Sequence, residues 1–184
     1  MASVKGGLVE KLTKLTGTEK YYAGSHPICG SEETGVNAAR ADLFDGNLCL
    51  LTPVPKTKKR AIAEVQSLWQ ALGMTVVSMA PTRHDQIVAA VSHLPLLVAS
   101  ALINQIGEEK ILRFSGPGLR DLTRIAGSNP TMWAEILTVN KKAVLDRLDG
   151  MMETLMLVKQ HVKSEEPSRI KAWLQQARRR QLRM

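Results

Sequence analysis

Aromatic residues make up only 4% of this 184-residue chain, and it contains only two cysteines. A core with so few rings must rest on Leu, Val, Ile, Ala and Met, and a hydrophobic content of 44% is enough to build one. Cys29 and Cys49 form neither a disulfide framework nor a metal-ligand spacing, so we interpret them as reduced cytosolic thiols. The composition therefore predicts a folded protein without a disulfide scaffold or a zinc finger.

The sequence also offers no single apolar run that is long and uncharged enough to cross a bilayer. The most apolar stretch, Leu94 to Ile106, is short, and Asn104 and Gln105 interrupt it, so we interpret it as a buried helix. The first seven residues contain no apolar core of a signal peptide. We therefore expect a cytoplasmic protein that does not enter a membrane.

Acidic residues are fewer than basic ones: the chain has 17 Asp and Glu against 25 Lys and Arg, which gives a formal net charge of +8. The excess gathers in residues 162–184, which contain seven basic and two acidic side chains. Such a tail can bind nucleic acid or an anionic surface, but most charge runs are the solvated face of a helix. No aromatic RNA-binding signature accompanies the tail, so we do not expect a nucleic-acid partner.

Residues 1–81 alternate between helix-like and strand-like segments, which predicts an α/β fragment. Leucines at helical spacing predict a first helix that ends at Gly17, and a second apolar stripe predicts a helix over 62–72 with Gly73 as its C-terminal cap. Residues 24–35 are rich in Gly, Ser, Pro and Glu and therefore read as a loop. The predicted strands are 20–23, 47–52 and 75–79.

Strand patterns stop after Pro81, and the rest of the chain reads as helical. A helix is predicted from Thr82 to Ile106 with a kink at Pro95, and a long one from Pro130 through Met156. A shorter segment covers 112–126 and a last helix covers 167–182. We therefore place a domain boundary near Pro81, between an α/β part (1–81) and an all-helical part (82–184).

Several polar groups lie where packing does not require them. His26 would sit in the Gly-rich loop, and with an ordinary pKa near ~6.5 it could take a proton at neutral pH. His84-Asp85 opens an otherwise apolar helix. Arg120 and Arg124 are four residues apart on one predicted helix and form a fork suited to carboxylates. Taken singly, each of these features has an ordinary structural explanation.

Taken together and in order, the polar stretches resemble the prephenate/arogenate dehydrogenase family of tyrosine biosynthesis. The resemblance covers most of the chain, from Ser3 to roughly Gln160. It implies an α/β fragment, namely the C-terminal part of a Rossmann-like nucleotide-binding domain, followed by an all-helical dimerisation domain. The matching segments are SVKG (3–6), GSHPICGSEETG (24–35), HDQIVAAVSHLP (84–95), GLRDLTRIAGSNPTMW (118–133) and Asn140.

The resemblance also implies a reaction, the NAD(P)-dependent oxidative decarboxylation of prephenate to 4-hydroxyphenylpyruvate, or of arogenate to tyrosine. In the family, the residues that match His26 and Ser3 act on the ring hydroxyl. Arg124 would hold a substrate carboxylate, and Trp133 could reach across a homodimer. The remaining residues that the resemblance places at the substrate are Ser31, Glu32, His93 and Asp121.

The sequence also departs from the family pattern. It contains no G-x-G-x-x-G turn and no acidic residue for the cofactor ribose, and Leu96 stands where many members have a second His. NAD versus NADP and prephenate versus arogenate therefore stay open.

Three functions are compatible with the sequence. The chain could be a dehydrogenase whose nucleotide-binding half is supplied by a separate chain or by preceding sequence. It could be a non-catalytic dimer that binds an aromatic or cyclohexadienyl acid. The least favoured function is a nucleic-acid-binding module that uses the basic tail.

Overall fold

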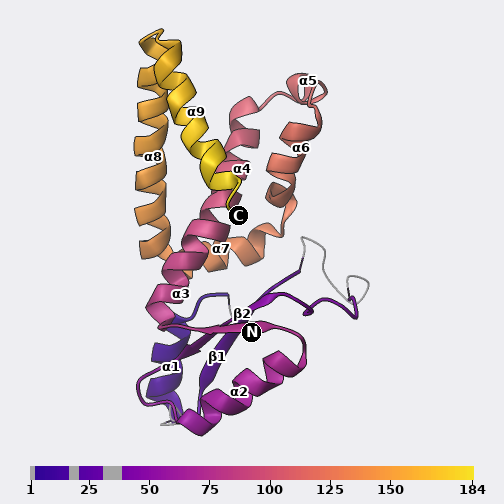
Figure 1. Cartoon of the computed structure of the whole chain (residues 1–184), viewed down its shortest axis with the longest axis vertical. Helices are drawn as coiled ribbons and strands as arrows, with labels where there is room; N and C mark the ends of the chain where they lie inside the picture. The colour runs from indigo at the N-terminus through magenta and orange to yellow at the C-terminus, as the bar shows by residue number, and fades with distance from the viewer. Residues whose placement is uncertain (1–2, 17–20, 31–38) are drawn as a thin grey trace. The chain divides into compact units, whose positions relative to one another are not determined.

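The structure is a computed structural model that describes residues 3–16, 21–30 and 39–184. It divides into two compact units, Met1–Val144 and Leu145–Met184, which are described separately below. Figure 1 shows the elements in chain order. Strands occur in the first unit, and the second consists of most of one long helix and the helix that follows it.

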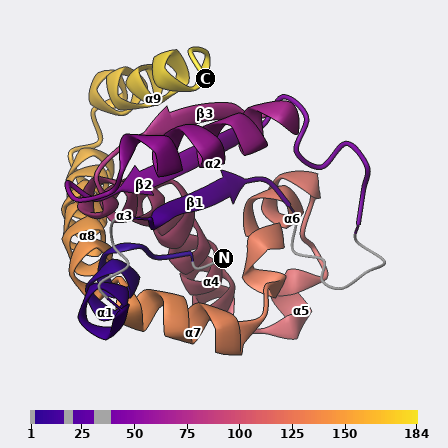
Figure 2. The ribbon, with the colours of Figure 1, turned by 90° about the horizontal axis from the view of Figure 1, so that it is seen from below.

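A small sheet forms the centre of the first unit. Its strands are β1 (Ala23–Ile28), β2 (Leu48–Pro53) and β3 (Thr75–Ser78), arranged in the order β1-β2-β3. β1 runs antiparallel to β2, whereas β2 and β3 are parallel and are joined by helix α2 (Lys59–Ala71). Parallel neighbours require such a crossover. Four consecutive residues of the central strand β2 are buried, and α2 packs across the sheet (Figure 2).

The core of this sheet uses the few aromatic residues that the chain has. Cys49, Trp69 and Met74 form a buried cluster, and Phe44 meets Trp69 edge-on with ring centroids 5.5 Å apart. Gly73 has a φ of 82° and ends α2, as predicted from the sequence. A side chain there would also clash, because a Cβ would lie 2.7 Å from an oxygen of Asp45.

The first strand differs from the prediction. The sequence favoured a strand over 20–23 and a loop from Gly24, but β1 runs from Ala23 to Ile28. Pairing with β2 overrides the local turn composition, and Thr52 also donates a hydrogen bond from its hydroxyl to the carbonyl of Gly24 at 3.1 Å. His26 therefore lies in a strand opposite Leu50, where the ladder fixes its position.

One nearly continuous helical stretch follows the sheet. It consists of α3 (Pro81–Val88), a π-helical turn η3 (Ala89–His93) and α4 (Leu94–Ile106), and Gly107 closes it with a φ of 67°. The π turn lies directly before Pro95, a residue that cannot donate a backbone hydrogen bond in a regular helix. It takes the place of the predicted kink and places His93 at its last position.

This stretch, Pro81–Ile106, is long and apolar enough by length and composition to cross a bilayer, with a mean hydropathy of 1.9 over its best window. The expectation that no run meets that test is wrong on this point, because the π turn joins two shorter segments into one helix of 26 residues. Core helices of globular proteins pass the same test. Here the helix carries the buried polar residues His84, Asp85 and His93, and 28% of its best window is buried.

The remaining helices are short until α8. Asn129 begins α7 (Pro130–Val139) by accepting a hydrogen bond from the backbone of Met132 at 3.1 Å. The single long helix predicted from Pro130 is wrong, because the chain breaks at Asn140, whose side chain is buried. The other elements are α1 (Gly6–Thr16), α5 (Glu109–Leu112), α6 (Pro117–Thr123), the 3-10 turn η4 (Arg124–Gly127), α8 (Lys141–Lys163) and α9 (Pro167–Gln181).

Candidate active site

The carboxylate of Asp85 joins the start of α1 to α3. Its two oxygens accept hydrogen bonds from the backbone nitrogens of Lys5 and Gly6, each at 2.8 Å. These N–H groups belong to the positive end of α1, where an anion is favoured. The approach is close, because a Cβ on Gly6 would lie 3.0 Å from the carboxylate. The sequence Lys5-Gly6 therefore permits a contact that a larger residue would strain.

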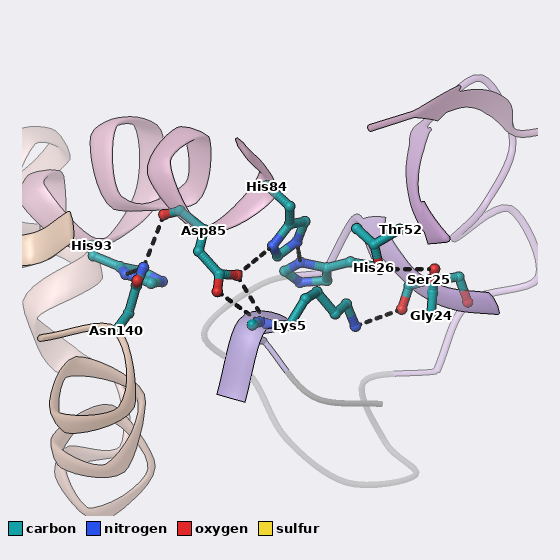
Figure 3. Close-up of polar contacts among 10 residues, drawn as sticks. Lys5, Gly24, Ser25, His26, Thr52, His84, Asp85, His93 and Asn140 are labelled. Atoms are coloured by element: carbon teal, nitrogen blue, oxygen red, sulfur yellow. Dashed lines mark hydrogen bonds and ion pairs between the residues drawn. The ribbon is translucent and has the colours of Figure 1, made fainter. Parts of the chain in front are cut away.

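Asp85 also begins a chain of hydrogen bonds that ends at His26 (Figure 3). Nδ1 of His84 lies 2.8 Å from Oδ1 of Asp85, and Nε2 of His84 lies 2.8 Å from Nδ1 of His26. The His84 ring is completely buried, whereas His26 is half-buried. α3 and β1, which lie 58 residues apart in the sequence, thus fix the orientation of the His26 ring.

The environment keeps His26 neutral. Burial is the main cause that lowers the pKa of His26 to about 4; the nearby His84, Lys5 and His93 contribute to this shift, and Asp85 opposes it. Burial alone would raise the pKa of Asp85, but the hydrogen bonds from His84 and from the backbone of Lys5 and Gly6 lower it overall. At neutral pH the site therefore combines an ionised Asp85 with a neutral His26, which has one bare ring nitrogen that can accept a proton.

Lys5 is a buried cation beside the histidines. Its side chain is almost inaccessible, and Nζ donates a hydrogen bond to the carbonyl of Ser25 at 2.8 Å. Burial lowers the pKa of Lys5, although Asp85 and Cys49 oppose the shift. Because Ser25 precedes His26, this contact also secures the strand that carries His26.

A second branch of the network reaches His93. Nδ2 of Asn140 donates to the backbone carbonyl of Asp85 at 2.9 Å and lies 3.2 Å from Nδ1 of His93. Burial lowers the pKa of His93, while Asp85 raises and His84 lowers it. Trp133 of α7 meets His93 edge-on with centroids 5.7 Å apart, and its Nε1 is buried without a hydrogen-bond partner in the described part of the chain.

The other predicted site residues are more dispersed. Ser3 lies just before α1 and lines a groove of about 330 Å³ between α1 and α7. Asp121 is exposed on α6, and Arg124 is exposed at the start of η4, which packs against α4. Ser31 and Glu32 lie outside the described residues. The structure thus includes His26 and His93 in one hydrogen-bond network and packs Trp133 against it. The roles of all the predicted site residues stay predictions.

The spacing of Arg120 and Arg124 suggested that both residues lie on one α-helix, but the structure places them in two consecutive elements. α6 ends at Thr123, and Arg124 begins a 3-10 turn. Arg124 directly follows α6 with an αR backbone conformation, and both arginines are exposed, so the fork stays a prediction.

Two sequence models of known domains match the chain. Residues 80–176 match the dimerization domain of prephenate dehydrogenase, and residues 1–78 match its nucleotide-binding domain. The first match alone covers more than half of the chain. The chain belongs to the prephenate dehydrogenase family.

Individual prephenate dehydrogenase relatives agree with this assignment. The prephenate dehydrogenase of Bacillus subtilis is 34% identical over 171 residues, which cover 90% of this chain and 46% of that protein. The cyclohexadienyl dehydrogenase of Zymomonas mobilis is 35% identical over 148 residues, or 77% of this chain and 50% of that protein. The chain therefore spans about half the length of the curated relatives that it matches.

Solved structures show the same fold. The prephenate dehydrogenase of Aquifex aeolicus, in complex with hydroxyphenyl propionate and NAD⁺, superposes with a TM-score of 0.91 at 33% identity, covering 98% of this chain and 64% of that one. The Synechocystis arogenate dehydrogenase gives a TM-score of 0.85 at 29% identity, covering 100% and 67%. These matches confirm the predicted nucleotide-binding fragment followed by a helical dimerisation domain.

NAD(P) is the cofactor of prephenate dehydrogenases, but the start of α1 is not open to its pyrophosphate. A pyrophosphate site needs backbone N–H groups at a helix start that are open to a phosphate. At α1 those of Lys5 and Gly6 already bind the carboxylate of Asp85. Among the described residues, the start of α1 therefore binds a side chain of the same chain and is not free to cradle the dinucleotide phosphates.

Sequence reasoning assigned no role to four residues that build the network, namely Lys5, His84, Asp85 and Asn140. All four lie in the stretches that resemble the prephenate dehydrogenase family. His84 and Asp85 carried a usable signal, because two adjacent polar residues near the start of a long apolar helix must find partners if they are buried. Their partners lie 58 and 80 residues away in the sequence, so no local pattern identifies them.

Proposed function

We propose that the chain carries the substrate-binding half and the proton acceptor of an NAD(P)-dependent prephenate or arogenate dehydrogenase. The observation that carries the proposal is the neutral His26, held by His84 and Asp85 beside the buried Lys5. An acceptor of this kind suits a reaction that removes a proton from a hydroxyl group at neutral pH. Membership of the prephenate dehydrogenase family supplies the reaction in which such a step occurs.

In this reaction a bound NAD(P) would supply the acceptor for the hydride that leaves the ring carbon bearing the hydroxyl group. The hydroxyl oxygen then develops carbonyl character, and His26 accepts its proton. When the ring carboxylate leaves as carbon dioxide, the bonding electron pair enters the ring, which becomes aromatic. The oxygen recovers the proton from His26 as a phenol, so the net change is the loss of a hydride and carbon dioxide.

Ser3 would donate a hydrogen bond near the same hydroxyl, and Arg124 would hold a carboxylate of the substrate. Arg suits that role because its guanidinium binds carboxylates through two parallel hydrogen bonds. We assign Ser31, Glu32, His93, Asp121 and Trp133 to the walls of the substrate site. Relatives named for prephenate, cyclohexadienyl and arogenate oxidation all resemble the chain, so either acid is a candidate substrate.

We also propose that the protein is a homodimer. Residues 80–176 match a dimerization domain, and α8 presents an exposed apolar stripe at helical spacing. The stripe consists of Leu145, Met152, Leu155 and Val162, each 47–59% exposed. Apolar faces of this size are typical of contact surfaces, and a two-fold dimer would cover them.

The nucleotide-binding half would come from a separate chain or from sequence that precedes this one, and the complete enzyme would be soluble and cytoplasmic. The isolated chain should therefore bind NAD⁺ very weakly, because its sequence contains no Gly-rich turn to cradle the pyrophosphate. Micromolar binding of NAD⁺ in calorimetry of this chain alone would contradict that expectation.

Reconstitution tests the function directly. The chain would be combined with the nucleotide-binding half of the Bacillus subtilis relative, and cofactor reduction would be followed with prephenate and with arogenate. We expect turnover with at least one of the two acids, together with release of carbon dioxide. A correctly assembled complex that binds both NAD⁺ and a product analogue yet reduces no cofactor would favour the non-catalytic binding protein instead.

A further inference from the structure

The hydrogen bonds around Asp85 determine which nitrogen of His26 carries its proton. An ionised carboxylate can only accept, so Nδ1 of His84 must donate to Asp85. In a neutral His84 ring, Nε2 is then an acceptor, and the Nδ1–H of His26 donates to it across 2.8 Å. His26 is left with a bare Nε2.

The hydrogen bonds around His93 determine the opposite arrangement. The backbone carbonyl of Asp85 can only accept, so the group of Asn140 that faces it at 2.9 Å must be the amide nitrogen. The same nitrogen lies 3.2 Å from Nδ1 of His93, and because it can only donate, Nδ1 of His93 must accept. The proton of a neutral His93 is therefore on Nε2.

We infer that His26 and His93 are held as opposite neutral tautomers, and that Asp85 sets both of them. Its carboxylate acts on His26 through His84, and its backbone carbonyl acts on His93 through Asn140 (Figure 3). His84 and Asn140 are thus positioning residues. Neither needs to touch the substrate in order to determine what the two histidines offer to it.

Because the two tautomers are opposite, the site favours one orientation of a bound ligand over the reverse. A ligand that reaches both rings meets an acceptor nitrogen at His26 and a donor N–H at His93. A hydroxyl group is therefore favoured at His26, and a carboxylate or carbonyl oxygen at His93. A ligand in the reverse orientation would place an oxygen without a proton against the bare nitrogen of His26, which leaves both groups without a hydrogen bond.

The role of the tautomers in orienting a substrate rests on the proposed function, but the tautomers themselves can be measured without any enzyme activity. The full chain would be labelled with ¹⁵N in histidine, and long-range ¹H–¹⁵N correlation at pH 7 distinguishes a protonated ring nitrogen from a bare one. Substitutions assign the signals of the four histidines, and the partly exposed His161 on α8, which lies outside the network, serves as the reference.

We expect a proton on Nδ1 of His26 and on Nε2 of His93, with a mixture of tautomers at His161. A proton on Nε2 of His26, which would accompany a charged His84, would overturn the inference. So would the same tautomer at both site histidines. This measurement uses the unaltered chain, so it does not depend on whether any variant folds.

Two substitutions test the two branches independently. Asn140→Asp replaces the donor with an acceptor, so His93 should move its proton to Nδ1 while His26 stays unchanged. His84→Gln should give a mixture of tautomers at His26 while His93 stays unchanged. If Asn140→Asp does not fold, Asn140→Ala should still turn His93 into a mixture. A folded Asn140 variant with an unchanged tautomer at His93 would contradict the proposed role of Asn140. A folded His84→Gln variant with an unchanged tautomer at His26 would contradict the proposed role of His84.

The reconstituted enzyme gives a second readout. In serine proteases, replacing the Asp that fixes the tautomer of the catalytic His lowers kcat by about 10⁴-fold. We expect His84→Gln to lower kcat by at least about tenfold, with KM nearly unchanged, because His84 acts on the acceptor and not on substrate binding. If the tautomers are as inferred but the enzyme turns over neither acid, the proposed function fails and the tautomer assignment stands.

Discussion

Residues up to Val144 and residues 145–184 use their side chains in opposite ways. The first region buries a set of polar side chains, among them Lys5, His84, Asp85 and Asn140, and pairs them with one another or with the backbone. In the second region no residue is buried, and large apolar side chains such as Leu155 and Met156 are 59% exposed. Burying polar groups is costly unless every group finds a partner.

The contrast indicates two different tasks. A buried polar network whose members hydrogen-bond to one another holds chemical groups in fixed orientations, which is what a catalytic site requires. Exposed apolar helices are stable in solution only if another surface covers them. We therefore expect the first region to carry the chemistry of the proposed function and the second to serve association. Substitutions in one region should leave the function of the other intact, and four experiments test this separation.

The largest effect should come from His26→Asn in the reconstituted enzyme. Removing a general base lowers turnover by about 10²–10⁴-fold. Because His26 acts on the hydroxyl group and not on the carboxylates, KM should change little, and the dimer should persist. The control is His161→Asn in the second region, which should leave turnover as it was. Normal turnover of the His26 variant would refute the mechanism.

A smaller effect, confined to the second region, is expected for Leu155→Glu. A charge in the centre of an apolar interface costs about 2 kcal/mol or more, so the dissociation constant of the dimer should rise roughly 30-fold or more. Sedimentation velocity measures this change. Thr154→Glu, which adds the same charge on another face of α8, should have no such effect. A stable monomer of the unaltered chain would count against the dimer itself.

Arg124→Gln should weaken substrate binding by about ten- to hundred-fold, because it removes a charge-assisted hydrogen bond to a carboxylate. Turnover at saturating substrate should be far less affected. Arg120→Gln changes an exposed arginine of the preceding helix in the same way and should leave KM unchanged. Equal effects of the two substitutions would mean that Arg124 has no specific partner in the substrate.

The smallest effect is expected for removal of the tail after Ala177. If the arginines there are a solvated helix face, turnover and dimerisation should be unaltered. Nucleic acid should not bind to the full chain at physiological salt, since purely electrostatic binding falls steeply as salt is added. Tight, sequence-selective binding that disappears with the tail would assign a further function to the second region.

Much of the fold follows from local patterns in the sequence. Leucine spacing predicted α1, and the apolar stripe before Gly73 predicted α2 and its end. His26 was placed in a loop because Gly24, Ser25 and Pro27 favour turns, and only pairing with β2 makes the segment a strand. Local propensity cannot reveal such a pairing, because the partner strand lies more than twenty residues away.

The candidate site was predictable only in part. His26 and His93 stood out by residue type and by resemblance, and the structure brings both into one network. The break at Asn140 was not visible, because the apolar periodicity continues from α7 into α8. The position of Asp85 at the centre of the network depends on contacts over 55 and 80 residues of sequence, which no pattern within one helix encodes.

The proposed mechanism requires a neutral His26 at neutral and mildly acidic pH, and the lowered pKa of His26 also affects stability. An unfolded chain binds a proton at His26 below its ordinary pKa of 6.5, whereas the folded chain does so only near a pKa of about 4. The contribution of His26 to stability is therefore present above pH 6.5 and is lost progressively as the pH falls toward 4. Circular dichroism at each pH would confirm that the protein is folded.

The most direct test is the pH dependence of kcat/KM in the reconstituted enzyme, over the range in which it stays folded. The acidic limb reports the pKa of the essential base in the free enzyme. Because burial lowers the pKa of His26 to about 4, activity should persist through pH 5.5 and decline only as the pH approaches that value. An acidic limb centred near the ordinary histidine pKa of about 6.5 would contradict the buried, neutral acceptor on which the mechanism rests.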